Sequence, residues 1–65
     1  MKLIINGKDK DVECKNISDL LNNLNLNKDA VAVELNKSII HRQNFDDTNL
    51  KDNDKLEIVT VVGGG

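Results

Sequence analysis

The sequence predicts an α+β fold in which a mixed sheet of four to five strands packs on one helix. Several short segments alternate apolar and polar side chains with the period of two that strands show, whereas only one segment has the spacing of an amphipathic helix. Sixty-five residues are enough for one small domain. We expect residues 1–62 to form this domain and residues 63–65 to form a flexible glycine tail.

The chain opens with a predicted β-hairpin. Residues 2–6 are predicted to form a strand, and Asn6-Gly7 is a strong hairpin signal because both positions tolerate a positive φ. The return strand, residues 8–13, is polar, which is typical of an edge strand whose charges discourage pairing with other chains. In the first strand Ile4 points to the face opposite its two apolar neighbours.

One helix is predicted to begin after Asn16. Asn16 can act as the N-cap, and Asp19 lies at the N3 position, near the positive end of the helix dipole. Apolar side chains at i, i+3, i+4 and i+7 form a single stripe: Ile17, Leu20, Leu21 and Leu24. The intervening asparagines are poor helix formers, so packing must hold this segment. We expect the helix to end near Asn25.

The second half of the chain predicts three further strands. Residues 31–35 alternate with period two, and a turn at Asn36-Lys37 leads to a short strand at 38–40. Residues 41–51 have no sustained period and are predicted to form a loop with one helical turn around 43–45. After a turn, residues 55–62 form the last strand. The predicted contribution of the sheet to the core is Leu3, Ile5, Val33, Leu35, Leu56 and Ile58.

Charge and composition exclude several classes of function. Nine basic residues stand against eleven acidic ones, and Phe45 is the only aromatic, so neither phosphate binding nor base stacking is supported. The single cysteine, Cys14, forms no internal disulfide and fits a reducing compartment. No long apolar run predicts a membrane span or a signal peptide. We expect a cytoplasmic protein, monomeric when free, with no nucleic-acid or membrane partner.

The most informative stretch is Val61-Val62-Gly63-Gly64-Gly65. Glycine buries no side chain and loses the most conformational entropy on folding, so three terminal glycines do not serve stability. At about 3.3–3.6 Å per extended residue they project the terminal carboxylate roughly 10 Å beyond the last valine. Without Cβ atoms, such a tail fits a slot too narrow for other residues. The pattern indicates a carrier whose reactive group is its own C-terminus, although a frayed chain end is the alternative.

A family resemblance extends over the whole chain. The segments that carry it are Asn6-Gly7, Ile17-Ser18-Asp19-Leu20-Leu21, Val33-Glu34-Leu35-Asn36, Ile40-His41-Arg42 with Phe45, Asp52-x-Asp54-x-Leu56-Glu57-Ile58-Val59, and Val62-Gly63-Gly64-Gly65. With these segments in this order, the sequence resembles the ubiquitin-like β-grasp proteins and, more narrowly, the ThiS-type sulfur carriers of thiamin (thiazole) biosynthesis. One departure is Asn53, where the family often has glycine, but asparagine also tolerates the left-handed region.

The resemblance implies a carrier protein that is a co-substrate and not an enzyme. It implies that a ThiF-type activating enzyme, using ATP and Mg, adenylates Gly65. By the same resemblance, a sulfur donor protein would then convert the adenylate to a thiocarboxylate, which would pass its sulfur to thiazole synthase. Gly63 and Gly64 would thread the tail into these active sites. The chain itself is expected to bind no nucleotide, because no helix follows its glycines to cradle a phosphate, and no metal, because Cys14 has no companion His or Cys at metal-ligand spacing.

The sheet face away from the helix carries three apolar side chains, which predict a docking surface for the partner enzymes: Ile4, Val59 and Val61. Arg42 is predicted to help dock an acidic partner, with a solvated loop charge as the alternative. Three rival functions stay open. The chain could be a ubiquitin-like modifier joined to lysines, a small subunit of the molybdopterin-synthase type, or a β-grasp interaction module whose glycines are incidental.

The other reactive side chains are interpreted as structural. His41, the only histidine, has no evident orienting partner and is expected in a loop. Cys14 is expected to be a small, half-buried residue near an edge strand. The carboxylates of Asp46-Asp47, Asp52 and Asp54 lie in turn-rich segments, where acidic residues are common.

Overall fold

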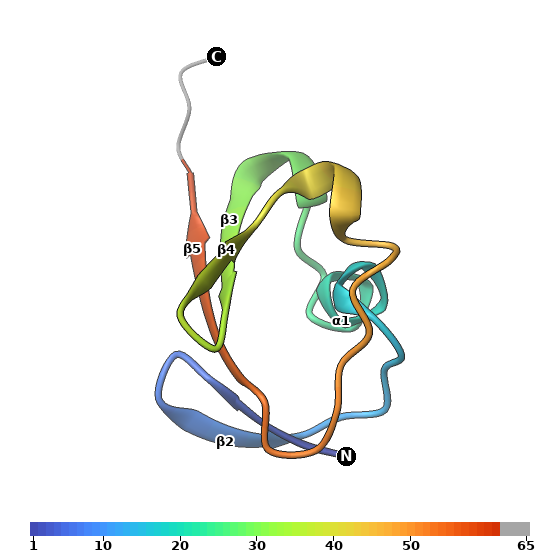
Figure 1. The fold of residues 1–65 in the computed structure, drawn as a ribbon, viewed down its shortest axis with the longest axis vertical. Coiled ribbons are helices and arrows are strands. Elements are labelled where there is room, and N and C mark those ends of the chain that lie inside the picture. Colours follow the sequence, from blue (N-terminus) through green and yellow to red (C-terminus); the bar gives the residue numbers. More distant parts are fainter. Residues whose placement is uncertain (62–65) are drawn as a thin grey trace.

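The computed structural model describes residues 1–61 and contains one α-helix, five strands and two short 3₁₀ turns. The elements are β1 (Lys2–Ile5), β2 (Lys8–Asp11), α1 (Ile17–Asn23), η1 (Lys28–Ala30), β3 (Val31–Leu35), β4 (Ser38–Ile40), η2 (Arg42–Asn44) and β5 (Lys55–Thr60). All five strands form one sheet, and α1 lies on one side of it (Figure 1). The α+β prediction is confirmed, with the last strand ending two residues earlier than expected.

The strand order is β2-β1-β5-β3-β4, so the last strand of the sequence lies at the centre of the sheet. Its pairing with β1 is parallel, with Ile5 beside Leu56, whereas its pairing with β3 and the two hairpins are antiparallel. All four residues of β2 are exposed at one edge, as predicted for the polar return strand. The first and the last strand of the sequence are therefore paired with each other in the middle of the sheet.

Both hairpins turn through the left-handed region. Asn6 and Gly7 have φ of 52° and 81°, and Asn36 and Lys37 have φ of 50° and 75°. Two successive positive φ angles are the signature of the tight turn whose twist matches that of the flanking strands. A Cβ atom on Gly7 would meet no atom within 4 Å, so the backbone angle and not the space favours glycine there.

Helix α1 is fixed at both ends by asparagines. The Asn16 Oδ1 accepts from the Asp19 N–H at 2.8 Å, which confirms the predicted N-cap. At the other end Asn25 adopts φ 58°, and the Leu26 N–H donates to the Leu21 carbonyl at 2.9 Å. This bond belongs to the Schellman motif, which satisfies helix carbonyls and folds the following apolar residue back onto the helix. The helix consequently ends at Asn23, two residues before the predicted end.

The core contains two residues that the sequence pattern did not place there. Phe45 and Leu50 are buried although residues 41–51 have no regular period. The loop runs past the start of α1, where Ile17 N–H donates to the Thr48 carbonyl and Leu50 N–H to the Lys15 carbonyl, so its apolar side chains point inward. Leu35, which was predicted in the core, is only partly buried at the hairpin end of β3. The buried apolar residues are Leu3, Ile5, Ile17, Leu20, Leu21, Val33, Phe45, Leu50, Leu56 and Ile58.

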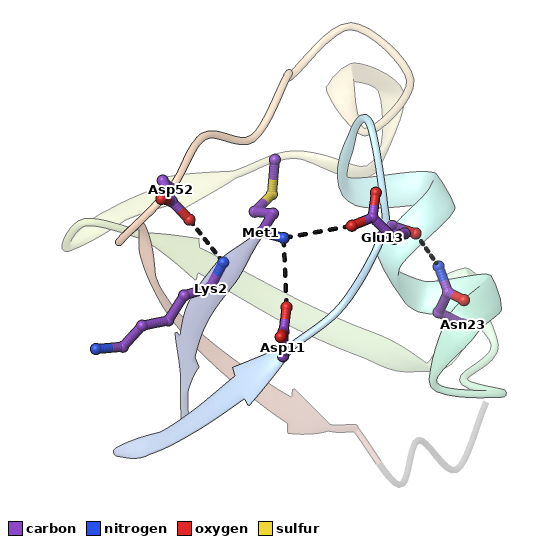
Figure 2. A network of polar contacts seen from close by, with 6 residues as sticks. All are labelled: Met1, Lys2, Asp11, Glu13, Asn23 and Asp52. Carbon is purple, nitrogen blue, oxygen red and sulfur yellow. Dashed lines mark hydrogen bonds and ion pairs between the residues drawn. The ribbon is translucent and has the colours of Figure 1, made fainter.

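Polar contacts tie the start of β1 to its surroundings (Figure 2). The amino group of Met1 lies 3.3 Å from the Asp11 carboxylate and 3.5 Å from that of Glu13. The Lys2 N–H donates to Asp52 at 2.6 Å, and the Glu13 carbonyl accepts from the Asn23 side chain at 3.0 Å. These contacts connect the first hairpin, the end of α1 and the turn before β5.

Candidate functional site

The predicted reactive group, on Gly65, comes five residues after the end of β5 in the sequence. This strand is flanked by β1 and β3, and the Val61 N–H beyond it still donates to the Ala30 carbonyl at 2.7 Å. Neighbouring backbone thus fixes the chain as far as Val61. Gly63, Gly64 and Gly65 lie outside the described residues, so their roles in threading and reaction stay predictions.

Two hairpin asparagines hold the backbone of β5. The Asn36 side chain accepts from the Lys55 N–H at 3.0 Å, while the Asn36 N–H donates to the Lys55 carbonyl at 2.7 Å. Asn6 uses both ends of its side-chain amide: Oδ1 accepts from the Ile58 N–H at 2.8 Å, and Nδ2 donates to the Ile58 carbonyl at 3.1 Å. The first half of β5 is therefore fixed by side chains as well as by the strand ladders.

A buried carboxylate stands just before β5. Asp54 is 3% exposed and accepts from the Lys51 N–H at 2.9 Å and the Asn36 Nδ2 at 3.1 Å, with the Lys51 ammonium at 3.2 Å. Burial alone would raise the pKa of Asp54, but these donors outweigh it and the pKa is lowered. The sequence pattern predicts an ordinary turn residue at Asp54, so its burial was not expected. Its partners are complete, so it is a structural anchor and not a free acid or base.

The outer face of the sheet, away from α1, carries exposed apolar side chains near the end of β5. Val59 is 59% exposed and Val61 is 51% exposed, in agreement with their predicted orientation. Ile39 of β4, at 68%, is more exposed than either, and the exposed Ala32 lies directly beside Val59. We call these four residues, Ala32, Ile39, Val59 and Val61, the outer patch. Ile39 was missed because the adjacent isoleucines 39 and 40 do not reveal which one faces outward.

Ile4 does not join the outer patch. It is only partly buried, but its neighbour on β5 is Lys55, four residues before Val59 and therefore about 13 Å away along the strand. The three apolar residues predicted to dock together do share one face of the sheet. The structure nevertheless separates Ile4 from Val59 and Val61 by most of the length of β5.

Two carboxylates border the outer patch. Glu34 of β3 and Glu57 of β5 are directly opposite each other, and both are exposed. Like charges at directly opposed positions of a sheet are destabilising. Within residues 1–61 neither carboxylate forms an ion pair. Lys37 and Lys55 line the same hollow as these two carboxylates, so this border of the patch carries charges of both signs.

Arg42 lies at the start of η2 and is engaged within the chain. Its Nη1 donates to the Asp29 carboxylate at 2.8 Å, and both side chains are more than half exposed. Such an exposed ion pair contributes at most about 1 kcal/mol and exchanges readily. The pair links η2 to η1 and leaves the predicted docking role of Arg42 a prediction.

Comparison with known proteins decides the family. The model of the ThiS family matches residues 3–65, almost the entire chain. The chain belongs to the ThiS family. It is 43% identical to the sulfur carrier protein ThiS of Bacillus subtilis over 97% of this chain and 98% of that protein. The crystal structure of the thiamine biosynthesis protein ThiS of Geobacter metallireducens has a TM-score of 0.84 with 38% identity over the full length of both chains, which confirms the β-grasp fold.

Two further relatives differ from this ThiS-family chain in length. The ycf40 protein of Pyropia yezoensis is 52% identical over 46 residues, and the match spans 71% of this chain and 65% of that protein. The thiazole synthase of Paramagnetospirillum magneticum is 38% identical over the whole of this chain, which corresponds to only 20% of that protein. A segment similar to the whole of this chain is thus part of that larger thiazole synthase polypeptide.

The remaining reactive side chains of this ThiS-family chain form no second site in the described part of the structure. Burial raises the pKa of the Cys14 thiol, and the carboxylates of Asp19 and Glu13 raise it further, so the thiol stays protonated near neutral pH. His41 precedes η2 and makes no capping hydrogen bond with its side chain. No group of three potential metal ligands occurs within residues 1–61. In the same range no helix is long and apolar enough to cross a membrane.

Proposed function

We propose that this chain is a sulfur carrier whose terminal Gly65 carboxylate is activated, converted to a thiocarboxylate and presented to a thiazole synthase. The observation that carries the proposal is the family match, which extends through the three glycines to residue 65. The similarity to the sulfur carrier of B. subtilis over nearly the whole length of both proteins supports the same role.

Thiazole synthases that contain a ThiS-like segment support the choice of acceptor. Two of them are similar to the whole of this chain over one fifth of their own length. Placing two proteins in one polypeptide raises the effective concentration of each for the other, which is useful when they act in succession. We therefore propose a thiazole synthase as the protein that receives sulfur from this carrier.

The proposed chemistry needs no acid, base or nucleophile beyond the tail carboxylate of this chain. A terminal carboxylate has a reference pKa of about 3.3–3.7 and is a poor electrophile when ionised. Attack of one carboxylate oxygen on the α-phosphorus of ATP, with Mg in a ThiF-type enzyme, releases pyrophosphate and forms an acyl-adenylate. The terminal sulfur of a donor persulfide then attacks the acyl carbon and expels AMP. A thiol finally cleaves the S–S bond of this product, leaving the thiocarboxylate and a disulfide.

The body of the domain has to supply binding energy for these encounters. Ordering three glycines costs on the order of 3–6 kcal/mol at about 1–2 kcal/mol per residue, and one carboxylate contact offsets little of it. The outer patch includes Val59 and Val61, near the C-terminal end of β5, and its aliphatic side chains are exposed. We propose that the activating enzyme covers it with an apolar surface. Opposite Glu34 and Glu57, that enzyme is expected to carry a basic side chain.

Intact-mass analysis of the protein from its own cells tests the proposal. Exchange of one terminal carboxylate oxygen for sulfur supports a carrier. A ladder of larger covalent adducts would instead support a modifier, and a chain that continues past Gly65 with no processing would contradict the mechanism. Purified chain should also stimulate ATP–pyrophosphate exchange by a ThiF-type enzyme from the same organism. A matched variant with an extra residue after Gly65 is the control, because it keeps the domain and removes only the terminal carboxylate from its position.

A further inference from the structure

Side-chain atoms of Asn6 take the place of a missing strand at the middle of β5. The parallel ladder between β1 and β5 comprises only Ile4 beside Lys55 and Ile5 beside Leu56. At Asn6 the chain turns away with φ 52°, after its N–H has donated to the Leu56 carbonyl at 2.9 Å. The next pair of β5 groups on this side, the N–H and carbonyl of Ile58, would lack a partner. Both are bound instead by the amide of the Asn6 side chain.

Beyond Ile58, β5 is paired on one side only. Backbone groups of successive strand residues alternate in direction, so those of Val59 and Val61 face β3, where Ala32 and Ala30 lie. The groups of Thr60 face the side that β1 has already left. Two-stranded ribbons twist more than wider sheets, so the place where two-sided pairing stops sets the direction in which the strand continues. Asn6 determines that place.

We propose that Asn6 is a positioning residue for the terminal glycines. By binding both backbone groups of Ile58, it fixes the direction in which β5 delivers the tail to the activating enzyme. This inference rests on the proposed function, because direction matters only if the tail carboxylate has to reach a fixed acceptor. Asn6 itself is not proposed to touch ATP or the sulfur donor.

The second hairpin supplies a matched control. Asn36 is also at the first position of a turn, has φ 50°, and binds the β5 backbone, but at Lys55, at the start of the strand. Glycine accepts positive φ without strain. Replacing either asparagine by glycine therefore keeps the turn and removes only side-chain hydrogen bonds. Asn6→Gly removes the side-chain bonds at Ile58, where pairing on the β1 side ends. Asn36→Gly removes the side-chain bond at Lys55, three residues earlier, together with the bond to Asp54.

Kinetics of activation by the ThiF-type enzyme separate positioning from stability. We expect Asn6→Gly to lower kcat about tenfold, with little change in the KM for the carrier, because a small misplacement of the reacting atom slows chemistry without weakening docking. Asn36→Gly should keep the wild-type kcat even if it destabilises the fold as much. Asn6→Asp keeps an acceptor for the Ile58 N–H but sets an oxygen against its carbonyl, so an intermediate kcat is expected.

A direct structural measurement makes the inference independent of the enzyme. Residual dipolar couplings of the N–H groups of Val59, Thr60 and Val61 should change in Asn6→Gly and stay at wild-type values in Asn36→Gly. Wild-type kcat together with wild-type couplings in Asn6→Gly would overturn the positioning role, as would equal kcat losses in the two variants. If the unaltered chain is not activated at all, the proposed function fails, and the couplings alone decide whether Asn6 directs the strand.

Discussion

Strand β5 is held differently along its two halves. From Lys55 to Ile58, neighbours on both sides bind the backbone, and the alternate side chains Leu56 and Ile58 are buried at 1% and 8% exposure. After Ile58 only β3 is adjacent, and Val59 and Val61 are more than half exposed. We call residues 55–58 the anchored half of β5, and residues 59–60 together with Val61 the presented half.

This contrast separates stability from function along the sequence. Burial and two-sided hydrogen bonding concentrate the folding energy in the first half, so changes in the second half cost little stability. The exposed half can therefore be shaped for partners without loss of the fold. Substitutions on the two sides of Ile58 should accordingly have opposite signatures.

The largest expected effect lies beyond β5 in the sequence, at Gly65. Adding one residue after Gly65, or deleting Gly65, should abolish adenylation, because displacement of the reacting atom by about 1 Å can already cost a hundredfold in rate. The thermal unfolding temperature should be unchanged, since Gly65 lies beyond β5 in the sequence. ATP–pyrophosphate exchange measures the first quantity and circular dichroism the second. Activation of the extended chain at the normal rate without trimming would contradict the terminal-carboxylate mechanism.

In the anchored half, Leu56→Ala should lower the free energy of unfolding by about 2–5 kcal/mol, because Leu56 is 1% exposed and its truncation leaves a cavity. Val59→Ala, three residues later, should change it by no more than about 0.5 kcal/mol. Urea denaturation of the two variants measures both values. Similar losses would show that the presented half is packed after all and would remove the contrast between the halves.

Val59→Asp should weaken binding to the activating enzyme while leaving the fold stable. Loss of one buried aliphatic contact is worth about 1.5–3 kcal/mol, or about ten- to a hundredfold in Kd. Asn22→Asp on α1 adds the same charge on the opposite side of the sheet and serves as the control. Titration calorimetry with the activating enzyme measures both. Unchanged affinity for Val59→Asp and for Ile39→Asp would place the docking surface elsewhere, with the Arg42 loop as the next candidate.

The smallest expected effect concerns the carboxylate that anchors the start of β5. Because the pKa of Asp54 is lowered by folding, its stabilising contribution is complete above the ordinary value of 3.8 and is lost as the pH falls through the lower value in the folded protein. Asp54→Asn should cost about 1–3 kcal/mol near neutral pH, and the difference from the wild type should shrink in acid. Asp47→Asn, at an exposed position, should leave the pH profile unchanged. Urea denaturation across the acid range would show a flat difference if Asp54 were unimportant.

The elements that local patterns determine were predictable. The Asn6-Gly7 turn, the Asn16 cap and the alternation of residues 31–35 each depend on neighbours in the sequence, and all three are confirmed. The burial of Phe45 depends instead on a loop that crosses the start of α1, and no period records that contact. The terminal glycines could be predicted as a candidate site from the sequence, because a run of three glycines after a strand is itself the pattern that indicates such a tail.

Contacts between residues that are far apart in the sequence were not predicted. The Asn6 amide meets Ile58 across 52 positions, and Asn36 meets Asp54 across 18, so neither contact leaves a local trace. The outer patch likewise depends on register: the pairing of Val33 with Ile40 turns Ile39 outward. Ile4 was grouped with Val59 because alternation fixes the face of a residue, but it does not fix the position of that residue along the neighbouring strand.

The Asn6-Gly7 turn also has a consequence for the chemical ageing of the protein. An asparagine followed by glycine is the dipeptide most exposed to deamidation, because the unhindered glycine nitrogen can attack the side-chain carbonyl and release ammonia through a cyclic imide. In the folded chain both polar atoms of the Asn6 side chain are bound to Ile58, so the side chain has to break these hydrogen bonds before it can rotate for the attack. The unfolded chain has no such protection. The extent of deamidation at this dipeptide should therefore increase with the time that each molecule has spent unfolded. The residue altered would be Asn6, whose amide binds the backbone of β5.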